Sequence, residues 1–286
     1  MIREAVEVGI GERSDTRTVF LLPEGLVPTA VAELRDFEGS RVSSLAIGCQ
    51  GMHWEDVSPE GNFGAFTSSL PARAAMNLGA TWSIIGHSEE RKAKLQVIAE
   101  YDRQVERDQE RKLAALNAVD RIIRGEVICA LEAGLNVLLC IGETAEQRGR
   151  GTELELDDRL GSVLRSQISG ALQGAERFTP ASEIAIGYEP IWAIGPGKVP
   201  PGQAYISRAS SYAKAGAREQ LGVDVPVVYG GGLKQENAEM IASIETIDGG
   251  LVALTRFTGE IGFDVQGLKF IIDRYRQAGP QAAEIQ

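Results

Sequence analysis

The chain has 286 residues, of which 43% are hydrophobic and 24% are charged, and its formal net charge is −11. This composition is typical of a globular protein, and no apolar run in the sequence is long enough to cross a membrane, so no membrane partner is expected. The negative charge argues against nucleic acid as a partner, because its phosphates would be repelled overall. A small phosphate ligand remains compatible, since nearby amides and one or two cations outweigh a distant net charge.

Cysteine and histidine usage narrows the chemistry. The three cysteines form no CxxC pair, which favours a reducing, cytoplasmic location over a disulfide framework. Charges interrupt Met1–Arg17, so we expect no signal peptide. Only two histidines occur, His53 and His87, and no cluster has the spacing of metal ligands. We therefore expect chemistry without a metal or another cofactor.

The N-terminal segment is predicted to be helical, because Ile2, Ala5 and Val6 recur at helical spacing. A strand over 6–10 is the alternative, but too few residues separate it from the next strand for a parallel crossover. The pattern then predicts a strand over 18–22, a helix over 27–34, a strand over 44–48, a helix over 70–78 and a strand over 82–85.

A long charged segment follows, over 92–123. Leu95, Ile98, Leu113 and Leu116 belong to apolar series at steps of three and four residues, which indicates an amphipathic helix or a helix pair. Two interpretations stay open: an additional surface helix on the rim of the fold, or a cover for the site mouth or subunit contact.

Strands and helices continue to alternate to the end of the chain. The predicted elements are a helix over 127–133, a strand over 137–141, a helix over 154–172, a strand over 183–188, a helix over 203–221, strands over 225–229 and 250–254, and a helix over 263–278. The length and this alternation predict one domain, 1–286, with an α/β barrel architecture and a charged helical insertion at 92–123.

The stretch GYEPIWAIGPGK, residues 187–198, carries the main chemical signal. Glu189 ends an apolar strand and Pro190 follows at once, which places the carboxylate at the carboxyl end of the sheet. The loop after it combines apolar side chains with Gly195 and Gly197, as expected of a lid that excludes water and offers amides to an anion. A surface salt bridge of Glu189 is the alternative.

Two further motifs end predicted strands. In IIGHSEER, residues 84–91, His87 leaves a strand and is followed by Ser88 and Glu89, which we interpret as a helix cap and first turn. In YGGGLKQENA, residues 229–238, three glycines let backbone amides close on a phosphate, unless they form only a tight turn.

Together with LLCIGET at 138–144, these motifs in this order resemble the triosephosphate isomerase family, from about Thr16 to Ala278. The resemblance implies an α/β fold of the (β/α)8 TIM barrel class. Family members begin with a strand that ends in an Asn-x-Lys motif, and nothing similar precedes Thr16. The first strand is therefore expected to be missing or replaced: either the chain is truncated relative to the natural product, or another segment fills the gap.

The resemblance also implies roles for individual residues. Glu189 would be the catalytic base and His87 a neutral electrophile whose charge the helix N-terminus disfavours, a tuning for which triosephosphate isomerase is the standard example. Backbone amides of Gly195, Gly231 and Gly232 would bind the substrate's phosphate. Supporting positions would be Ser88, Glu89 and Lys198.

Several positions depart from the family pattern. Glu90 stands where the family usually has an arginine, and Gly232 where it has a serine. Ala253 and Leu254 replace a glycine pair that admits the phosphate, although Arg256 nearby offers a cation.

The loop over 50–67 matches the family's dimer-forming loop, so a homodimer through this loop is expected. Within it, Met52–Trp54 resembles the tetrulose-phosphate branch of the family. His53 and Trp54 are interpreted as interface packing, with a substrate role as the alternative.

The function implied by the resemblance is an aldose–ketose isomerase acting on a small phosphorylated sugar. Dihydroxyacetone phosphate and glyceraldehyde 3-phosphate would be interconverted through an enediol(ate). The alternatives are an isomerase of a four-carbon or other sugar phosphate, and a catalytically impaired barrel that binds without turnover because it lacks the first-strand lysine.

Overall fold

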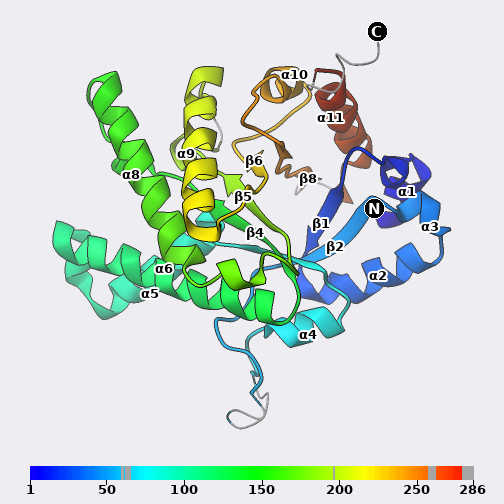
Figure 1. Ribbon diagram of the computed structural model, residues 1–286, viewed down its shortest axis with the longest axis horizontal. Coiled ribbons are helices and arrows are strands. Elements are labelled where there is room, and N and C mark those ends of the chain that lie inside the picture. The colour runs from blue at the N-terminus through cyan, green and yellow to red at the C-terminus, as the bar shows by residue number, and fades with distance from the viewer. Residues whose placement is uncertain (59–60, 62–65, 196, 257–261, 279–286) are drawn as a thin grey trace.

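The computed structural model describes residues 1–58, 61, 66–195, 197–256 and 262–278. Its centre is one sheet of seven parallel strands whose spatial order follows the chain (Figure 1). The strands are β1 (Thr18–Leu22), β2 (Leu45–Gln50), β3 (Trp82–Ile85), β4 (Asn136–Ile141), β5 (Ile184–Tyr188), β6 (Val227–Tyr229) and β7 (Gly249–Gly250). This sequential, all-parallel order with helical crossovers is the arrangement of a TIM barrel, as predicted.

Helices connect the strands and surround the sheet. They are α1 (Ile2–Glu7), α2 (Val27–Arg35), α3 (Gly39–Val42), α4 (Ala72–Asn77), α5 (Ser88–Tyr101), α6 (Gln109–Glu132), α7 (Ala145–Arg148), α8 (Glu153–Leu172), α9 (Gln203–Leu221), α10 (Ala238–Ala242) and α11 (Val265–Ala278). The prediction of an N-terminal helix is confirmed by α1. The charged segment over 92–123 forms a helix pair, in which α5 and the long α6 lie side by side (Figure 1).

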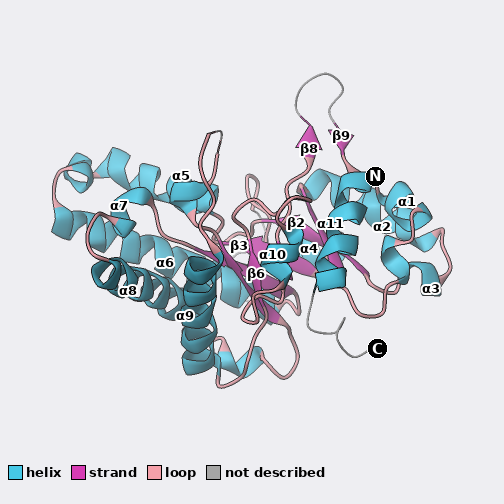
Figure 2. Cartoon of the chain, turned by 90° about the horizontal axis from the view of Figure 1, so that it is seen from above, coloured by secondary structure: helices cyan, strands magenta, loops and turns pink. Residues whose placement is uncertain are grey.

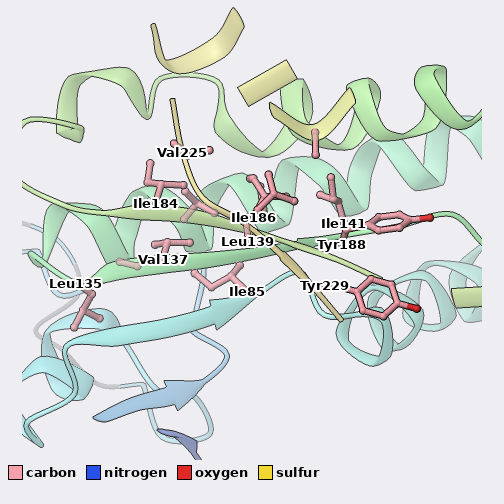
Figure 3. Close-up of a cluster of buried hydrophobic side chains, with 14 of the residues drawn as sticks. Ile85, Leu135, Val137, Leu139, Ile141, Ile184, Ile186, Tyr188, Val225 and Tyr229 are labelled. Atoms are coloured by element: carbon pink, nitrogen blue, oxygen red, sulfur yellow. The ribbon is translucent and has the colours of Figure 1, made fainter. Parts of the chain in front are cut away.

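Alternation along the strands divides the core into two parts. On β4, Val137, Leu139 and Ile141 face the surrounding helices, where they join the large outer core (Figure 3). Leu138 and Cys140 face the other side of the sheet and belong to a smaller inner core. Because side chains alternate across a strand, one continuous apolar run serves both cores. The inner core also contains Trp82, Ala185, Val19, Leu21, Ala46, Ile84, Val228 and Leu251.

The barrel is not closed by strand pairing in the described residues, since β1 and β7 are the two edges of the sheet. The prediction of a last strand over 250–254 was wrong, because β7 ends at Gly250. Leu251 still donates from its backbone N to the Tyr229 carbonyl, 2.9 Å away, but the next residues leave the sheet. This segment has a neighbouring strand on one side only. It therefore lacks the second set of backbone hydrogen bonds that keeps an inner strand extended.

A short hairpin, which the sequence pattern did not predict, follows the last strand. Strands β8 (Thr255–Arg256) and β9 (Gly262–Phe263) pair antiparallel and project from the body of the molecule (Figure 2). Phe263 makes an edge-on contact with Phe20 of β1, with 6.2 Å between the ring centroids. The closing helix therefore begins at Val265, later than predicted, and Phe263 packs toward the open edge of the sheet.

Ion pairs tie the last helix to the segment before β1. The guanidinium of Arg13 lies 2.5 Å from Asp273 of α11 and is largely buried, and Arg276 of the same helix pairs with Asp15. These contacts join the two sequence ends of the barrel on the side where the strands are unpaired. A partly buried charged hydrogen bond contributes more to stability than an exposed one.

We predict that Arg13→Met or Asp273→Asn lowers the free energy of unfolding by about 1–2 kcal/mol each, because either change removes a charged hydrogen bond. Urea denaturation of both variants and their double mutant should reveal a coupling energy of at least about 0.5 kcal/mol. The exposed pair Arg218 and Asp224 provides the control, with coupling near zero. Fully additive losses at Arg13 and Asp273 would contradict this role.

Candidate active site

Strands β3 and β5 bring His87 and Glu189 to the same rim of the sheet. Both strands pair in parallel with β4, so their carboxyl ends lie next to one another. His87 follows β3 at the start of α5, and Glu189 directly follows β5. Nε2 of His87 lies 3.0 Å from Oε1 of Glu189.

Glu189 is enclosed, with a relative exposure of 3%. Besides His87, it accepts hydrogen bonds from Ser88: the backbone N lies 3.1 Å from Oε2 and the hydroxyl Oγ 3.4 Å from Oε1. Its own backbone N donates to the carbonyl of Ile141, 2.8 Å away. A buried carboxylate requires such donors, because it has lost its hydration.

His87 itself caps α5, in the position that the sequence pattern gave to Ser88. Its Nδ1 accepts the backbone N–H of Glu89 at 3.4 Å, so in the neutral ring the proton is on Nε2 and points to Glu189. We expected a ring held neutral by the helix N-terminus. Instead, the hydrogen bond to Glu189 raises the pKa of His87 above its ordinary value, against the opposing effect of burial.

A glycine permits the close approach of the strands at this rim. A Cβ on Gly142 would lie 1.7 Å from the carbonyl O of Glu189. No side chain fits there, so the β4 end can contact the backbone of Glu189 only because residue 142 is glycine. The position of Glu189 is thus fixed by backbone packing as well as by its side-chain partners.

A second buried carboxylate, Glu143, contacts the start of the loop that follows β5. It is fully buried and accepts from Nε1 of Trp192 at 2.5 Å and from the hydroxyls of Tyr205 at 2.9 Å and Tyr188 at 3.2 Å. Burial raises the pKa of Glu143, while these donors act in the opposite direction. The guanidinium of Arg148 lies 4.3 Å from the centroid of the Trp192 ring.

The sequence pattern did not predict this network around Glu143. A carboxylate directly after a buried strand was the available signal. Its partners Trp192 and Tyr205 lie on later segments, so spacing alone did not connect them.

The residues predicted to bind phosphate differ in their exposure to solvent. Gly232 is exposed, with a φ of +90°, and lines the same cavity as His87 and Glu189. Gly231 is buried behind that surface, where its carbonyl accepts from the Tyr229 hydroxyl. Gly195 and Lys198, on the predicted lid, are exposed, and the backbone N of Lys198 donates to the Gly195 carbonyl at 3.2 Å.

The cavity at this rim has a volume of about 2950 Å³. It contains the His87–Glu189 pair and continues along β1 and past Leu251 and Leu254 into the space between the unpaired edges. A cavity for one small ligand is several-fold smaller, about 300–1,000 Å³. The excess volume arises because the sheet is open where an eighth strand would complete a barrel.

Comparison with known proteins identifies the family. The sequence profile described as "Triosephosphate isomerase" matches residues 11–260. The chain belongs to the triosephosphate isomerase family.

Named relatives agree with this assignment. The chain is 32% identical over 246 residues to the triosephosphate isomerase of Oleidesulfovibrio alaskensis, which covers 85% of this chain and 82% of that protein. It is 31% identical over 256 residues to the L-erythrulose-1-phosphate isomerase of Rhizobium meliloti, covering 88% and 83%. The crystal structure of triosephosphate isomerase from Bartonella henselae superposes with a TM-score of 0.65 at 23% identity, covering 96% and 91%, which shows the shared fold.

The remaining predicted residues of this triosephosphate isomerase family member lie in the segment over 253–256 and in the loop over 50–67. Ala253 is exposed and Leu254 is partly buried against the outer core. The side chain of Arg256 and six residues of the 50–67 loop (59–60 and 62–65) lie outside the described part of the chain. In the described part of that loop, the His53 ring makes tilted contacts with the rings of Trp54 and Phe66, with ring centroids 4.4 and 5.1 Å away.

Two kinds of feature are absent from the described residues. None of the helices there is both long and apolar enough to cross a membrane. Among the same residues, His, Cys, Asp and Glu side chains form no group of three able to hold a metal ion.

We predict that Glu189→Gln lowers the pKa of His87, because the amide removes the carboxylate that stabilises the imidazolium. NMR titration of the two histidine rings measures this pKa, and the signal of His53 serves as the internal control. Since the raised pKa belongs to the folded state, its contribution to stability is present at low pH and lost as pH rises through it. A His87 titration unchanged by the substitution would show that the contact is absent in solution.

We predict that Trp192→Phe lowers kcat/KM about tenfold, because a lost hydrogen bond to a charged group is worth about 1.5 kcal/mol. Phenylalanine keeps most of the ring but cannot donate to Glu143. Steady-state kinetics measure the effect, and Tyr101→Phe at the exposed end of α5 is the control. Equal kcat/KM in wild type and Trp192→Phe would argue that the anchor does not serve the lid.

Proposed function

We propose that this protein is an aldose–ketose isomerase that moves a proton between two adjacent carbons of a small phosphorylated sugar. The observation that carries the proposal is the contact of a buried carboxylate with an imidazole at 3.0 Å, at the carboxyl ends of β5 and β3. A general base and a hydrogen-bond donor at one rim are what enolisation beside a carbonyl requires.

In the proposed reaction, Glu189 removes the proton from the carbon beside the carbonyl. Nε2–H of His87 donates to the carbonyl oxygen and stabilises the enediolate, then moves a proton between its two oxygens. Glu189 returns the proton to the neighbouring carbon, so the product is an isomer and no other reactant is consumed.

Substrate binding must separate the two groups, since a 3.0 Å contact leaves no room for a carbonyl between them. The carboxylate therefore has to leave Nε2 and its Ser88 donors when the ligand enters. This exchange removes the interaction that raises the pKa of His87, so the ring becomes a better neutral donor in the complex. Binding energy of the phosphate would drive the exchange.

The phosphate would be held by backbone amides rather than by a buried cation. Gly232 lines the cavity beside Glu189, and the lid glycine Gly195 would supply a further amide when the loop closes. Gly231 is buried, so its own N–H would not reach the phosphate. It would contribute only by positioning the peptide group that carries the Gly232 N–H. Lys198 would anchor the far end of the lid.

Dihydroxyacetone phosphate and glyceraldehyde 3-phosphate are the proposed substrate pair. A four-carbon ketose phosphate is the second candidate, favoured by the similarity to the L-erythrulose-1-phosphate isomerase of Rhizobium meliloti and by the motif Met52–Trp54.

The proposal extends to assembly and location. A homodimer would form through the 50–67 loop, where the exposed Trp54 offers an apolar contact. Three free, buried cysteines fit a reducing, cytoplasmic environment.

We predict that Glu189→Gln reduces kcat by about 10²–10⁴-fold without changing the fold, because the amide cannot act as a base. Coupled assays with dihydroxyacetone phosphate and L-erythrulose 1-phosphate measure the rate and select the substrate, and Glu219→Gln on the surface of α9 is the control. A rate unaffected by Glu189→Gln would refute the mechanism. Absence of turnover with both sugars in the folded wild type would point to binding without catalysis.

A further inference from the structure

We propose that Glu90, Lys94 and Glu126 form a buried triad that positions the catalytic His87, and that the triad works only while its two carboxyl groups share one proton. The inference rests on the proposed catalytic role of His87. None of the three residues touches the reacting atoms, so they are positioning residues rather than catalytic ones.

The triad acts on the turn that delivers His87. Oε2 of Glu90 accepts the backbone N–H of Gly86 at 2.6 Å, and the Gly86 carbonyl accepts Nε of Arg91 at 2.8 Å. Gly86 has a φ of +78°, and a Cβ there would lie 2.9 Å from the carbonyl O of Cys140. Gly86, immediately before His87, is therefore held by hydrogen bonds at both its N–H and its carbonyl, in a backbone conformation that favours glycine.

Lys94 connects Glu90 to the neighbouring helix. Its ammonium pairs with Oε1 of Glu90 one turn earlier on α5 and lies 2.8 Å from Oε1 of Glu126 on α6. The side chains of Lys94, Glu90 and Glu126 are 16%, 20% and 2% exposed. Charges buried to this extent are costly unless each has a partner, and removal of one partner leaves the others uncompensated.

Charge balance requires a proton in this triad. Two carboxylates and one ammonium would leave a net negative charge in the interior, whereas one added proton makes the triad neutral. Burial, the charge of Glu90 and a hydrogen bond with Glu90 raise the pKa of Glu126 to about 9. Burial would raise the pKa of Glu90 as well, but the hydrogen bond from Glu126 and the charge of Lys94 lower it.

The second oxygen of Glu126 agrees with this protonation. Oε2 of Glu126 is buried and has no hydrogen-bond partner among the described residues, and a buried carboxyl oxygen without a donor disfavours the ionised form. The proton would lie in the hydrogen bond between Glu126 and Glu90, and the Glu90 carboxylate in turn accepts the Gly86 amide.

Acidic groups lie near Cys129, which follows Glu126 by three residues on α6. Burial raises the pKa of Cys129, and the charges of Asp56, Glu132, Glu126 and Glu55 act in the same direction. The positive charge of Arg91 on α5 is engaged by Asp120 at 2.6 Å. Lys94 is thus the cation that directly contacts Glu126 among the described residues.

The triad explains how Glu90 is accommodated where the family usually has an arginine. A carboxylate accepts the Gly86 amide, which a guanidinium cannot do, and Lys94 supplies the positive charge. The same residues line the cavity that contains His87 and Glu189, so the triad lies next to the reacting groups.

The first test compares Lys94→Met with Lys92→Met, an exposed lysine on the same helix. We expect Lys94→Met to lower kcat by about 10- to 100-fold with KM within about threefold, because a small displacement of a catalytic group costs this much. Lys92→Met should behave as wild type. Unchanged kcat in Lys94→Met, or a loss of thermal stability alone, would overturn the proposal.

The second test uses Glu126→Gln, which keeps a neutral donor in the place of the protonated acid. We expect its kcat at pH 7 to lie within about twofold of wild type. The wild-type kcat should fall above about pH 9, as Glu126 ionises, and this fall should be absent in Glu126→Gln. A loss at pH 7 as large as that of Lys94→Met would show that Glu126 is ionised and would overturn the shared proton.

NMR of the His87 ring, which needs no catalytic turnover, tests this inference independently of the proposed function. The chain has only two histidines, so the NMR signals of the His87 ring can be assigned with a His53→Gln variant. Lys94→Met should shift the His87 resonances and its pKa, whereas Lys92→Met should not. A wild type without isomerase activity would refute the proposed function but leave this measurement valid, and unshifted His87 signals in Lys94→Met would refute the triad's positioning role.

Discussion

The parallel pairing of β3 and β5 with the strand between them is the constraint on which the site depends. Backbone hydrogen bonds to β4 fix both neighbours in register, and this places His87 and Glu189 within hydrogen-bond distance. Gly142 allows the end of β4 to reach the backbone of Glu189. The contact between His87 and Glu189 therefore depends on the inner strands of the sheet and does not require a closed barrel.

Three buried glutamates show how this protein keeps carboxyl groups in its interior. Glu189 accepts from Ser88 and contacts His87, and the proposed reaction requires it to release both. Glu143 is held by three aromatic donors, a set that binds a carboxylate without a formal positive charge. Glu126 contacts Lys94, and burial together with Glu90 raises its pKa to about 9. The partners of each carboxyl group thus match whether that group would move in the proposed reaction.

The sequence was most informative where structure depends on local pattern. Glu189 was predictable because an apolar strand ends at it and a proline follows, and α9 was predicted with its observed bounds. The end of the last strand at Gly250 was not predictable. An apolar sequence suggests a strand there, but an extended backbone also needs a second partner strand, which the sequence pattern does not reveal. Lys94 and Glu126 were also missed, since their contact joins two helices. The available signal was a glutamate on the apolar face of α6, between Ile123 and Val127.

The open edges of the sheet divide the site into two halves with different physical bases. The half proposed to transfer protons lies on β3, β4 and β5, where each strand has two neighbours and Glu189 is buried and paired with His87. The half proposed to bind the anion lies toward β6 and β7, where the last strand is two residues long and the cavity continues into the gap beside β1. A phosphate there would be bound by amides whose positions depend on short loops rather than on strand pairing. Chemistry at the first half can therefore persist while the ligand accepted at the second half changes, because the two halves are supported by different parts of the sheet.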